Sequence, residues 1–279
     1  MNIDFIILAA GKGTRMGGDS PKVLASLAGK PMIQHLIDTV DSFPNSKTSI
    51  VVGYKSNEVE RNLVSQKKLR FVKQKNQLGT AHAVKQALPN IRKNSVAVIL
   101  YGDVPLVKKN TLNRLIKSAS TGKLSLLTFI KEDPTGYGRI IRGSRKNVQK
   151  ITEHKDASSA EKEIREVNSG ILAIKASLLQ QFISKIKNNN AAKEYYLTDL
   201  VEISINHSVD VVATLCDPYE VSGANDKKDL HELERAYQKK LAEDLLKSGV
   251  TIADTSRIDI RGDIKIGQDS FVDINNIFE

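Results

Sequence analysis

The sequence predicts an α/β protein whose sheet is mostly parallel and covered by helices on both faces. Strand-like and helix-like segments alternate over the first hundred residues. Several strand-like segments, such as 5–9, are continuous apolar runs, which is typical of strands buried on both faces. Two of these runs end in the glycine-containing polar stretches GKGTR and GD. Because ligands of such sheets bind beyond the carboxyl ends of the strands, both stretches are candidate parts of one site.

The alternation can be followed along the chain. After the first strand, Pro31 fits the first turn of a helix. The helical period from Met32 places four apolar residues on one face, Ile33, Leu36, Ile37 and Val40. The next predicted segments are a strand at 49–53, a helix from Asn57, a strand at 69–72, a helix from Thr80 and a strand at 96–103. This rhythm indicates parallel strands joined by helices.

The middle of the chain has a different pattern. GRIIRG (138–143) and NVQKITEH (147–154) alternate between apolar and polar residues, which predicts an antiparallel β excursion. EVNSGILAIK (166–175) predicts another strand, and helices near 177–186 and 198–206 precede a strand in DVVATL (210–215). From Asp226 a long amphipathic helix, with Gly249 as its C-terminal cap, places five residues on one stripe, Leu230, Leu233, Tyr237, Leu241 and Leu245.

The last thirty residues follow a period of six. Two apolar series share this spacing, Ile260, Ile266, Val272 and Phe278 in one and Ile252, Ile258 and Ile264 in the other. Hexapeptide spacing is typical of a β-helix, although a short β tail with accidental spacing remains an alternative. We therefore expect a first domain over 1–225, a linker helix over 226–249 and the incomplete beginning of a β-helix over 250–279. Because ~3 or more repeats normally stack into a stable core, this segment is expected to lean on the globular domain or another chain, or to come from a longer protein.

Composition limits the classes of partner. The formal net charge of +10 is compatible with nucleic acid, with a polyanionic small molecule or with lysine used for solubility. The densest basic cluster, QKKLRFVKQK (66–75), has one aromatic residue and no nucleic-acid motif, so we interpret it as a solvated face. No apolar stretch approaches the ~20 residues of a membrane span. The single cysteine, Cys216, excludes an intrachain disulfide and favours a cytoplasmic location.

The glycine-rich turn in MNIDFIILAAGKGTRMGG fits neither common phosphate-binding template. Met16 stands where the dinucleotide fingerprint needs its third glycine, and Asp19 stands where the P-loop needs lysine. Gly11 and Gly13 would still let backbone N–H groups approach phosphate oxygens. Arg15 and Lys22 would add positive charge, although solvent exposure explains two basic residues in a loop equally well.

Nine motifs together carry a specific resemblance. In sequence order they are LAAGKGTRM, PKVL, QLGTAHAV, LYGDVPL, DPTGYGRI, EHKDA, EVNSGI, EYYLTD and GAN. This set resembles the sugar-nucleotide pyrophosphorylases. Within them it is most similar to the uridyltransferase part of the bacterial bifunctional N-acetylglucosamine-1-phosphate uridyltransferase/glucosamine-1-phosphate acetyltransferases. The similarity covers essentially the whole chain.

The resemblance implies a Rossmann-like nucleotidyltransferase domain followed by the start of a left-handed β-helix. It implies that UTP and N-acetylglucosamine 1-phosphate are joined, with Mg²⁺, to give UDP-N-acetylglucosamine and pyrophosphate in the cytoplasm, for the synthesis of peptidoglycan and lipopolysaccharide. In that family the full β-helix carries the acetyltransferase and makes trimers. We therefore expect no acetyltransferase activity from this chain, and a homo-oligomer is possible although a trimer is in doubt.

The resemblance also implies roles for individual residues. Arg15 and Lys22 would be catalytic, and Asp103 and Asn225 would hold Mg²⁺ besides contacting substrate. The residues implied for the nucleotide are Leu8, Ala9, Ala10, Gly11, Lys22, Gln74, Gly79 and Thr80. Those implied for the sugar phosphate are Tyr101, Gly102, Gly138, Glu153 and Asn168. Tyr196 and Thr198 belong to a matching motif without an individual role.

The residues themselves leave some alternatives open. Asp103 at the tip of an apolar strand suits a hard cation but equally suits a turn, and Asn225 could also cap the long helix. The histidines have no metal-ligand spacing and Cys216 has no nucleophile signature. Another sugar-phosphate or cofactor nucleotidyltransferase, a non-catalytic nucleotide-sugar-binding module and a nucleic-acid binder are the alternative functions, the last suggested by charge alone.

Overall fold

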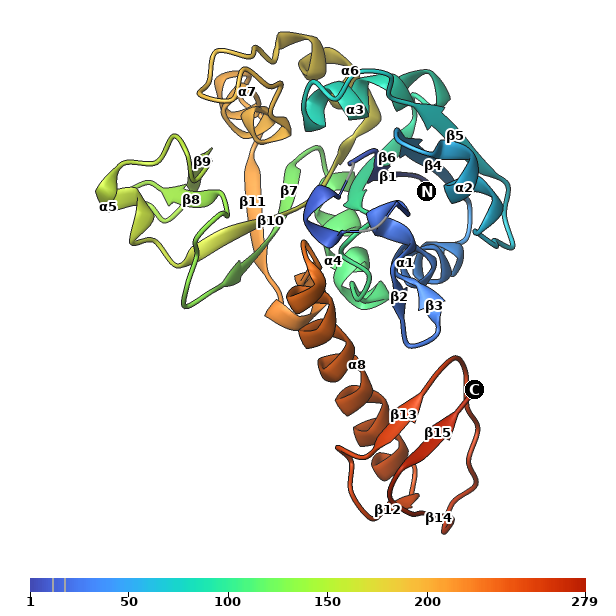
Figure 1. The fold of residues 1–279 in the computed structure, drawn as a ribbon. Helices are drawn as coiled ribbons and strands as arrows, with labels where there is room; N and C mark the ends of the chain where they lie inside the picture. The colour runs from blue at the N-terminus through green and yellow to red at the C-terminus, as the bar shows by residue number, and fades with distance from the viewer. Residues whose placement is uncertain (12, 18) are drawn as a thin grey trace.

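The computed structural model describes residues 1–11, 13–17 and 19–279. Lys12 and Gly18 of the opening loop lie outside the described residues. A twisted central sheet lies between two layers of helices, and a long helix leads from it to a small C-terminal unit (Figure 1).

The strands confirm the predicted mixture of parallel and antiparallel β structure. Their bounds are β1 Asn2–Ala9, β2 Ser26–Leu27, β3 Lys30–Pro31, β4 Ser46–Val52, β5 Leu69–Lys73, β6 Ser95–Tyr101, β7 Leu124–Ile130, β8 Arg139–Arg142, β9 Val148–Thr152, β10 Glu166–Lys175, β11 Val211–Leu215, β12 Thr251–Ile252, β13 Ile258–Ile260, β14 Phe271–Val272 and β15 Asn276–Phe278. The main sheet has the order β11-β7-β10-β6-β1-β4-β5, and β8 and β9 extend from β10. Along this order β10 alone is antiparallel to its neighbours, so the sheet is mostly parallel.

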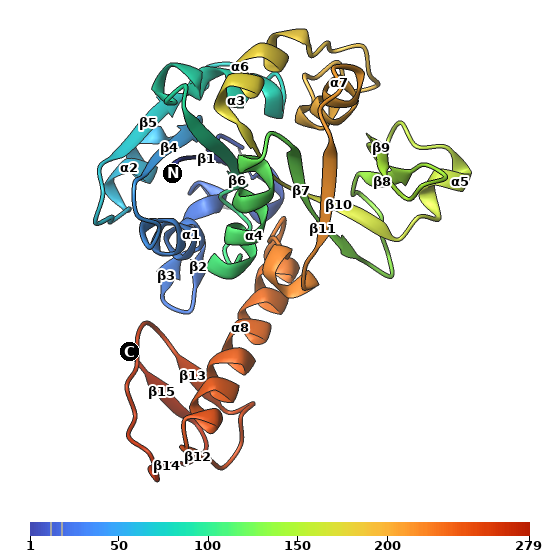
Figure 2. The same cartoon turned by 180° about the vertical axis from the view of Figure 1, so that it is seen from behind.

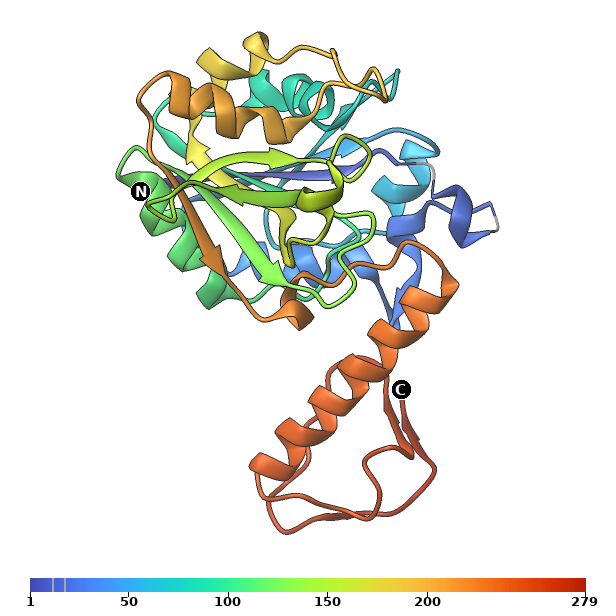
Figure 3. The ribbon, with the colours of Figure 1, turned by 90° about the vertical axis from the view of Figure 1, so that its left-hand side faces the viewer.

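The α-helices are distributed over both faces of the sheet. They are α1 Met32–Asp41, α2 Ser56–Arg61, α3 Thr80–Ala87, α4 Lys109–Ser120, α5 Ser159–Lys162, α6 Ala176–Phe182, α7 Leu200–Asn206 and α8 Lys227–Lys247. Helices α1 and α4 pack on one face, and α3, α6 and α7 pack on the other (Figure 3). As predicted, the apolar face of α1 is buried. Pro31, expected in the first turn of the helix, instead lies at the N-cap, where it pairs with Ser26.

Strand β1 explains why the sheet needs two helical layers. Its side chains alternate between faces with a period of two. Phe5 and Ile7 enter the cluster that contains α1 and α4, whereas Ile6 and Leu8 enter the cluster that contains α3. A strand that is apolar on both faces is stable only where both faces are covered, so the run FIILAA leads to a three-layer arrangement.

Sequence reasoning missed one strand and one helix of this core. Strand β7 pairs with β10 and β11, and α4 covers it through Leu112, Leu115 and Ile116. The β8–β9 hairpin, which was predicted, is attached through β8 to β10 and lies on the side of the molecule away from β5 (Figure 2).

Helix α8 connects the sheet to the C-terminal unit. Leu233 packs near β2 and the predicted stripe continues into a second cluster, which joins the end of the helix to both hexapeptide series. Here β12 pairs with β14 and β13 pairs with β15, both in parallel. The unit also contacts the globular part, since Gly262 N donates to Ala28 O at 3.0 Å and Lys30 forms an ion pair with Asp263. The six-residue spacing therefore does place its apolar residues in one core.

Among the described residues, no helix combines the length and the apolar character that a bilayer crossing requires.

Candidate active site

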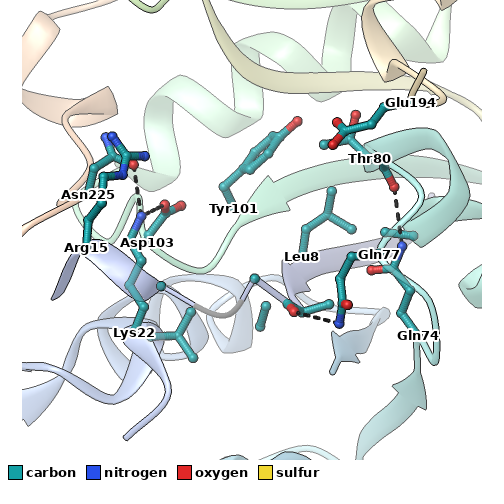
Figure 4. A pocket seen from close by; sticks show the side chains of 17 residues that line it. Leu8, Arg15, Lys22, Gln74, Gln77, Thr80, Tyr101, Asp103, Glu194 and Asn225 are labelled. Atoms are coloured by element: carbon teal, nitrogen blue, oxygen red, sulfur yellow. Dashed lines mark hydrogen bonds and ion pairs between the residues drawn. The ribbon is translucent and has the colours of Figure 1, made fainter. Parts of the chain in front are cut away.

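A cavity of about 370 Å³ opens at the carboxyl ends of β1 and β6. It is lined by Leu8, Ala9, Ala10, Gly11, Gly13, Arg15, Lys22, Val23, Gln74, Gln77, Gly79, Thr80, Ala83, Tyr101, Asp103, Glu194 and Asn225. Figure 4 shows Tyr101 between two groups of side chains, with Arg15, Lys22, Asp103 and Asn225 on one side and Gln74, Gln77, Thr80 and Glu194 on the other. This is the place where an α/β sheet of this topology binds ligands.

The turn after β1 brings the backbone and Lys22 together. Gly13 has a left-handed φ of 62°, and a Cβ placed on it would lie 2.4 Å from the Cβ of Lys22. Glycine is therefore required both for the backbone conformation and for the contact. The turn continues into a short 3-10 helix, η1 (Thr14–Met16), which carries Arg15, and Lys22 begins a second one, η2 (Lys22–Leu24).

Lys22, Asp103 and Asn225 form a charged cluster from three distant parts of the chain. Lys22 Nζ donates to Asp103 Oδ2 at 2.5 Å and to Asn225 Oδ1 at 3.0 Å (Figure 4). The side chains of Lys22 and Asp103 are 12% and 24% exposed. Two oxygens therefore converge on one positive centre at the charged end of the cavity.

Asn225 does not cap helix α8, which was the alternative interpretation of its position. Asp226 is the N-cap and accepts from Lys228 N and Asp229 N. The Asn225 backbone N–H donates to Asp229 Oδ2 at 2.8 Å, so the start of α8 fixes the residue. Its side-chain amide therefore remains directed into the cavity.

Arg15 lies at the same end of the cavity as this cluster. Its side chain is exposed, and Figure 4 shows it beside Asn225. An exposed guanidinium at the mouth of a cavity can contact an anionic ligand without first breaking a buried ion pair.

The opposite end of the cavity is built around Gln74. Its buried amide Nε2 lies 3.3 Å from Gly79 O and 2.9 Å from His82 Nδ1. His82 also contacts the amide of Gln86. This chain of contacts fixes the orientation of an amide whose groups suit the recognition of a nucleobase edge.

The turn at Gly79 and Thr80 is held by residues from the EYYLTD motif. Tyr195 N donates to Leu78 O, and Ala81 N donates to Tyr195 O. Gly79 has a φ of +110°, and a Cβ there would lie 2.5 Å from Tyr195 O. Thr80 Oγ1 accepts from the backbone of the same motif, from Leu197 N at 3.0 Å. The motif thus shapes the amide end of the cavity.

Tyr101 occupies the middle of the cavity wall and depends on a glycine of β10. Burial, together with the negative charges of Glu153 and Asp103, raises the pKa of its phenol, so the ring is neutral at ordinary pH. Gly170 has a φ of +84°, and a Cβ there would lie 2.5 Å from Tyr101 Cε2. Sequence reasoning gave Gly170 no role, although it stands in the EVNSGI motif.

Three of the residues expected at the sugar meet near the β8–β9 hairpin. Asn168 N donates to Gly138 O at 2.8 Å, and Glu153 Oε1 accepts from Thr198 Oγ1 at 3.0 Å. Burial raises the pKa of Glu153, and the buried Oδ1 of Asn168 has no hydrogen-bond partner among the described residues. A partly exposed carboxylate and an amide whose buried oxygen has no partner among the described residues thus lie near Gly138.

Most of the predicted site residues lie around one cavity. Those outside its lining are Gly102, Gly138, Glu153 and Asn168. Gly102 instead packs under it, where a Cβ would lie 3.0 Å from Val23 Cγ1. The lining residues to which the sequence assigned no role are Val23, Gln77, Ala83 and Glu194, while Gly13 was expected only to let the backbone approach phosphate. Gln77 could have been found, because it stands in the same polar stretch as Gln74.

The described residues contain no cluster of three or more His, Cys, Asp or Glu side chains arranged for a metal ion. The histidines make structural contacts instead, as His35 does with Leu27 O at 2.8 Å and His154 with Arg139. Burial raises the pKa of the Cys216 thiol to about 11, which leaves it unreactive as a nucleophile.

Comparison with known proteins identifies the family to which the chain is related. Residues 5–167, more than half of the chain, match the family described as MobA-like NTP transferase domain. The chain belongs to this family.

Solved structures agree on the fold. A UDP-glucose pyrophosphorylase complexed with UDP-glucose has a TM-score of 0.69 at 18% identity and covers 86% of this chain and 100% of its own. A glucose-1-phosphate thymidylyltransferase from Bacillus anthracis has a TM-score of 0.65 at 17% identity and covers 83% of this chain and 94% of its own.

The chain also has curated relatives, whose sequence identity is higher than that of the solved structures. The bifunctional protein GlmU of Pseudomonas entomophila is 47% identical over 100% of this chain and 61% of the relative. GlmU of Pseudomonas syringae pv. tomato is 48% identical over 99% of this chain and 60% of the relative. The chain therefore spans about three fifths of the length of these relatives.

Proposed function

We propose that the chain is a UTP:N-acetylglucosamine-1-phosphate uridylyltransferase. The observation that carries this proposal is the cavity with two unlike ends, where Gln74 and the turn at Gly79 suit a base, and Lys22, Asp103 and Asn225 suit phosphate and a cation. The GlmU relatives favour this substrate pair over other members of the NTP transferase family. The separate group of Glu153 and Asn168 beyond Tyr101 supports a second substrate with hydroxyl and amide groups.

The reaction needs no covalent intermediate. A phosphate oxygen of the sugar phosphate attacks the α-phosphorus of UTP in line and forms the new P–O bond. The bond to the β-phosphate breaks, and its electron pair leaves with pyrophosphate. The second phosphate ionisation lies near pH ~6, so the nucleophile is already an anion at neutral pH and requires no general base. The protein contributes orientation and charge stabilisation.

The chain's own residues divide this work by position. The turn at Gly11 and Gly13 brings backbone close to the triphosphate, while Gln74 orients the base. Arg15 supplies positive charge close to the α-phosphate and the departing pyrophosphate, on which negative charge develops. Lys22 supports the same charge from deeper in the cavity.

A divalent cation fits the charged end of the cavity. Asp103 and Asn225 would hold it, because their oxygens already converge on one positive centre, the Lys22 ammonium. These are the hard oxygen ligands that Mg²⁺ prefers, and Mg²⁺ takes its other ligands from phosphates and water. When bound, Mg²⁺ would supply neutralisation of phosphate charge.

We also propose that the chain divides into a catalytic domain over 1–225, a linker helix over 226–249 and the start of a left-handed β-helix over 250–279. The parallel pairing of Thr251 with Phe271 and of Ile258 with Asn276 supports this, since successive coils of a β-helix pair in parallel.

The test is pyrophosphate release from a matrix of substrates. UTP, dTTP, CTP and GTP are each combined with N-acetylglucosamine 1-phosphate or glucose 1-phosphate, with Mg²⁺ and with EDTA. We expect release to be fastest with UTP, N-acetylglucosamine 1-phosphate and Mg²⁺, and to stop in EDTA. A preference for GTP or for glucose 1-phosphate would replace the proposed substrates, and absence of release from every pair would indicate a binding module.

A further inference from the structure

The oxygens proposed as cation ligands are engaged by the protein's own lysine. Lys22 Nζ lies 2.5 Å from Asp103 Oδ2 and 3.0 Å from Asn225 Oδ1. The ammonium thus neutralises the charge of Asp103 and donates a hydrogen bond to each of the two oxygens. A divalent cation bound to the same oxygens would lie against this ammonium, and like charges in so small a space repel each other.

The lysine is held in this position by the fold. Its side chain is 12% exposed, and its Cβ lies against Gly13 in the turn after β1. Asn225 is fixed from the other side by the contact of its backbone with Asp229. Three elements, the opening turn, the end of β6 and the start of α8, therefore converge on one ammonium.

We propose that Lys22 is a built-in competitor of the divalent cation. It occupies the Asp103–Asn225 pair in the free protein and leaves it when the cation arrives with the nucleotide, whose phosphates give the ammonium new partners. This inference rests on the proposed function, because it takes Asp103 and Asn225 as the cation ligands. Lys22 then determines when the site binds a cation. The free protein binds a lone cation weakly, and the lysine is released toward phosphate at the step that brings the cation in.

The test measures cation binding without nucleotide and does not depend on activity. Mn²⁺ is titrated into the full chain and free Mn²⁺ is followed by electron paramagnetic resonance, since carboxylate and amide oxygens bind Mn²⁺ much as they bind Mg²⁺. The variants are Lys22→Met, which removes the charge, and Lys22→Arg, which keeps it. Lys30→Met is the matched control, because it removes one charge from another lysine–aspartate pair, Lys30–Asp263.

We expect Lys22→Met to lower the Kd for Mn²⁺ by about tenfold or more, because charge-assisted hydrogen bonds no longer compete. Lys22→Arg and Lys30→Met should bind Mn²⁺ as weakly as the unchanged protein. Adding Asp103→Asn to Lys22→Met should abolish the gain. Thermal unfolding checks that Lys22→Met is folded. If this variant shows no cooperative thermal transition, Lys22→Gln is used in its place.

Two different failures can be told apart. Equal Mn²⁺ affinity in the unchanged protein and Lys22→Met, with a loss on Asp103→Asn, would overturn the competition and leave the cation site of the proposed function in place. Mn²⁺ binding that no variant at Lys22 or Asp103 alters would overturn both the competition and the proposed ligands. A gain in Lys30→Met equal to that in Lys22→Met would reduce the effect to net charge and overturn the competition.

Discussion

Arg15 and Lys22 bring positive charge to the same end of the cavity, but their surroundings differ. Lys22 is nearly buried and is held by Asp103 and Asn225, whereas Arg15 is exposed at the cavity mouth. A charge that already has partners in the free protein contributes to structure as well as to ligand binding. A charge exposed at the mouth is free to follow the phosphate on which charge develops, so the two residues should respond differently to substitution.

The first prediction concerns Arg15. We expect Arg15→Ala to lower kcat by about 100-fold or more, because it removes positive charge where the transition state gains negative charge. Binding of the product UDP-N-acetylglucosamine, measured by calorimetry, should weaken far less. Equal losses in turnover and in product binding would show that Arg15 binds ligand uniformly and would contradict its catalytic assignment. Thermal unfolding of the variant should be unchanged.

Gly170 is a positioning residue that acts through Tyr101. Gly170→Ala adds a Cβ 2.5 Å from Tyr101 Cε2 at a φ of +84°, so the ring must move. Gly136→Ala is the matched control, because Gly136 has a φ of +82° and nothing lies within 4 Å of its added Cβ. Both variants should lose about 1–2 kcal/mol of stability from backbone strain.

The two glycine variants should differ in their kinetics. Gly170→Ala should raise the KM for the sugar phosphate by about tenfold more than Gly136→Ala does, because only the first displaces the cavity wall. Steady-state kinetics with each substrate varied in turn measures this. Identical KM values in the two variants would mean that Tyr101 tolerates the displacement or does not border the sugar phosphate.

Among the elements, the start of α7 places Asp199 close to two carboxylates from the segment after β9 and to Glu202 of the helix itself. Burial, together with Glu202, Glu153 and Asp156, raises the pKa of Asp199 to about 6. In the unfolded chain the pKa of an aspartate is ~3.9. Between these values the folded state binds the proton more tightly, so Asp199 lowers the free energy of unfolding as pH rises from 4 to 6.

Asp199→Asn should therefore stabilise the protein in a pH-dependent way. We expect its Tm to rise by a few degrees at pH 7.5, where Asp199 is ionised in both states, and to change little at pH 4. Asp210→Asn serves as the control, since the Asp210 side chain is 78% exposed. At each pH, its Tm should equal that of the unchanged protein. An equal rise for Asp199→Asn at pH 4 and pH 7.5 would contradict a charge-based cost.

A buried amide contributes to the contact between helix α8 and the C-terminal unit. Gln238 Nε2 donates to Ile260 O at 2.8 Å, and Gln238 Oε1 accepts from Ile260 N at 2.8 Å. We expect Gln238→Leu to cost about 2–3 kcal/mol, because it leaves two buried backbone groups of β13 without partners. Amide hydrogen exchange should show Ile260 exchanging faster, whereas Lys239→Ala, at an exposed position of the same helix, should not change it. Unaltered protection of Ile260 would be the contrary result.

The elements also differ in how well the sequence predicted them. Strands β1, β4 and β6 and helix α1 followed from local periodicity, because each has an apolar pattern that is complete within its own residues. Gln238 could not be predicted, since its partner lies 22 positions away and its polar side chain falls beside the apolar stripe. The position of Asn225 was ambiguous for the same reason. Whether it caps α8 or faces the cavity depends on Asp226, which takes the capping role.

At the scale of the whole molecule, the fold explains how distant motifs make one site. Parallel strands end at the same edge of the sheet, so the turns after β1 and β6 meet there. Resemblance and topology together predicted twelve of the residues that line the cavity, while Glu194 was not selected although it begins the EYYLTD motif. The start of α8 completes the charged end and also leads to the C-terminal unit. Helix α8 thus links the cavity to the C-terminal unit.

Transfer of the uridylyl group to a sugar phosphate can be followed with labelled phosphate. The chain is incubated with N-acetylglucosamine 1-phosphate, Mg²⁺ and UTP labelled with ³²P at either the α- or the γ-phosphate. We predict that the α label appears in UDP-N-acetylglucosamine and the γ label in pyrophosphate. Appearance of the γ label in the sugar product, or of the α label in UMP without a sugar nucleotide, would contradict the account.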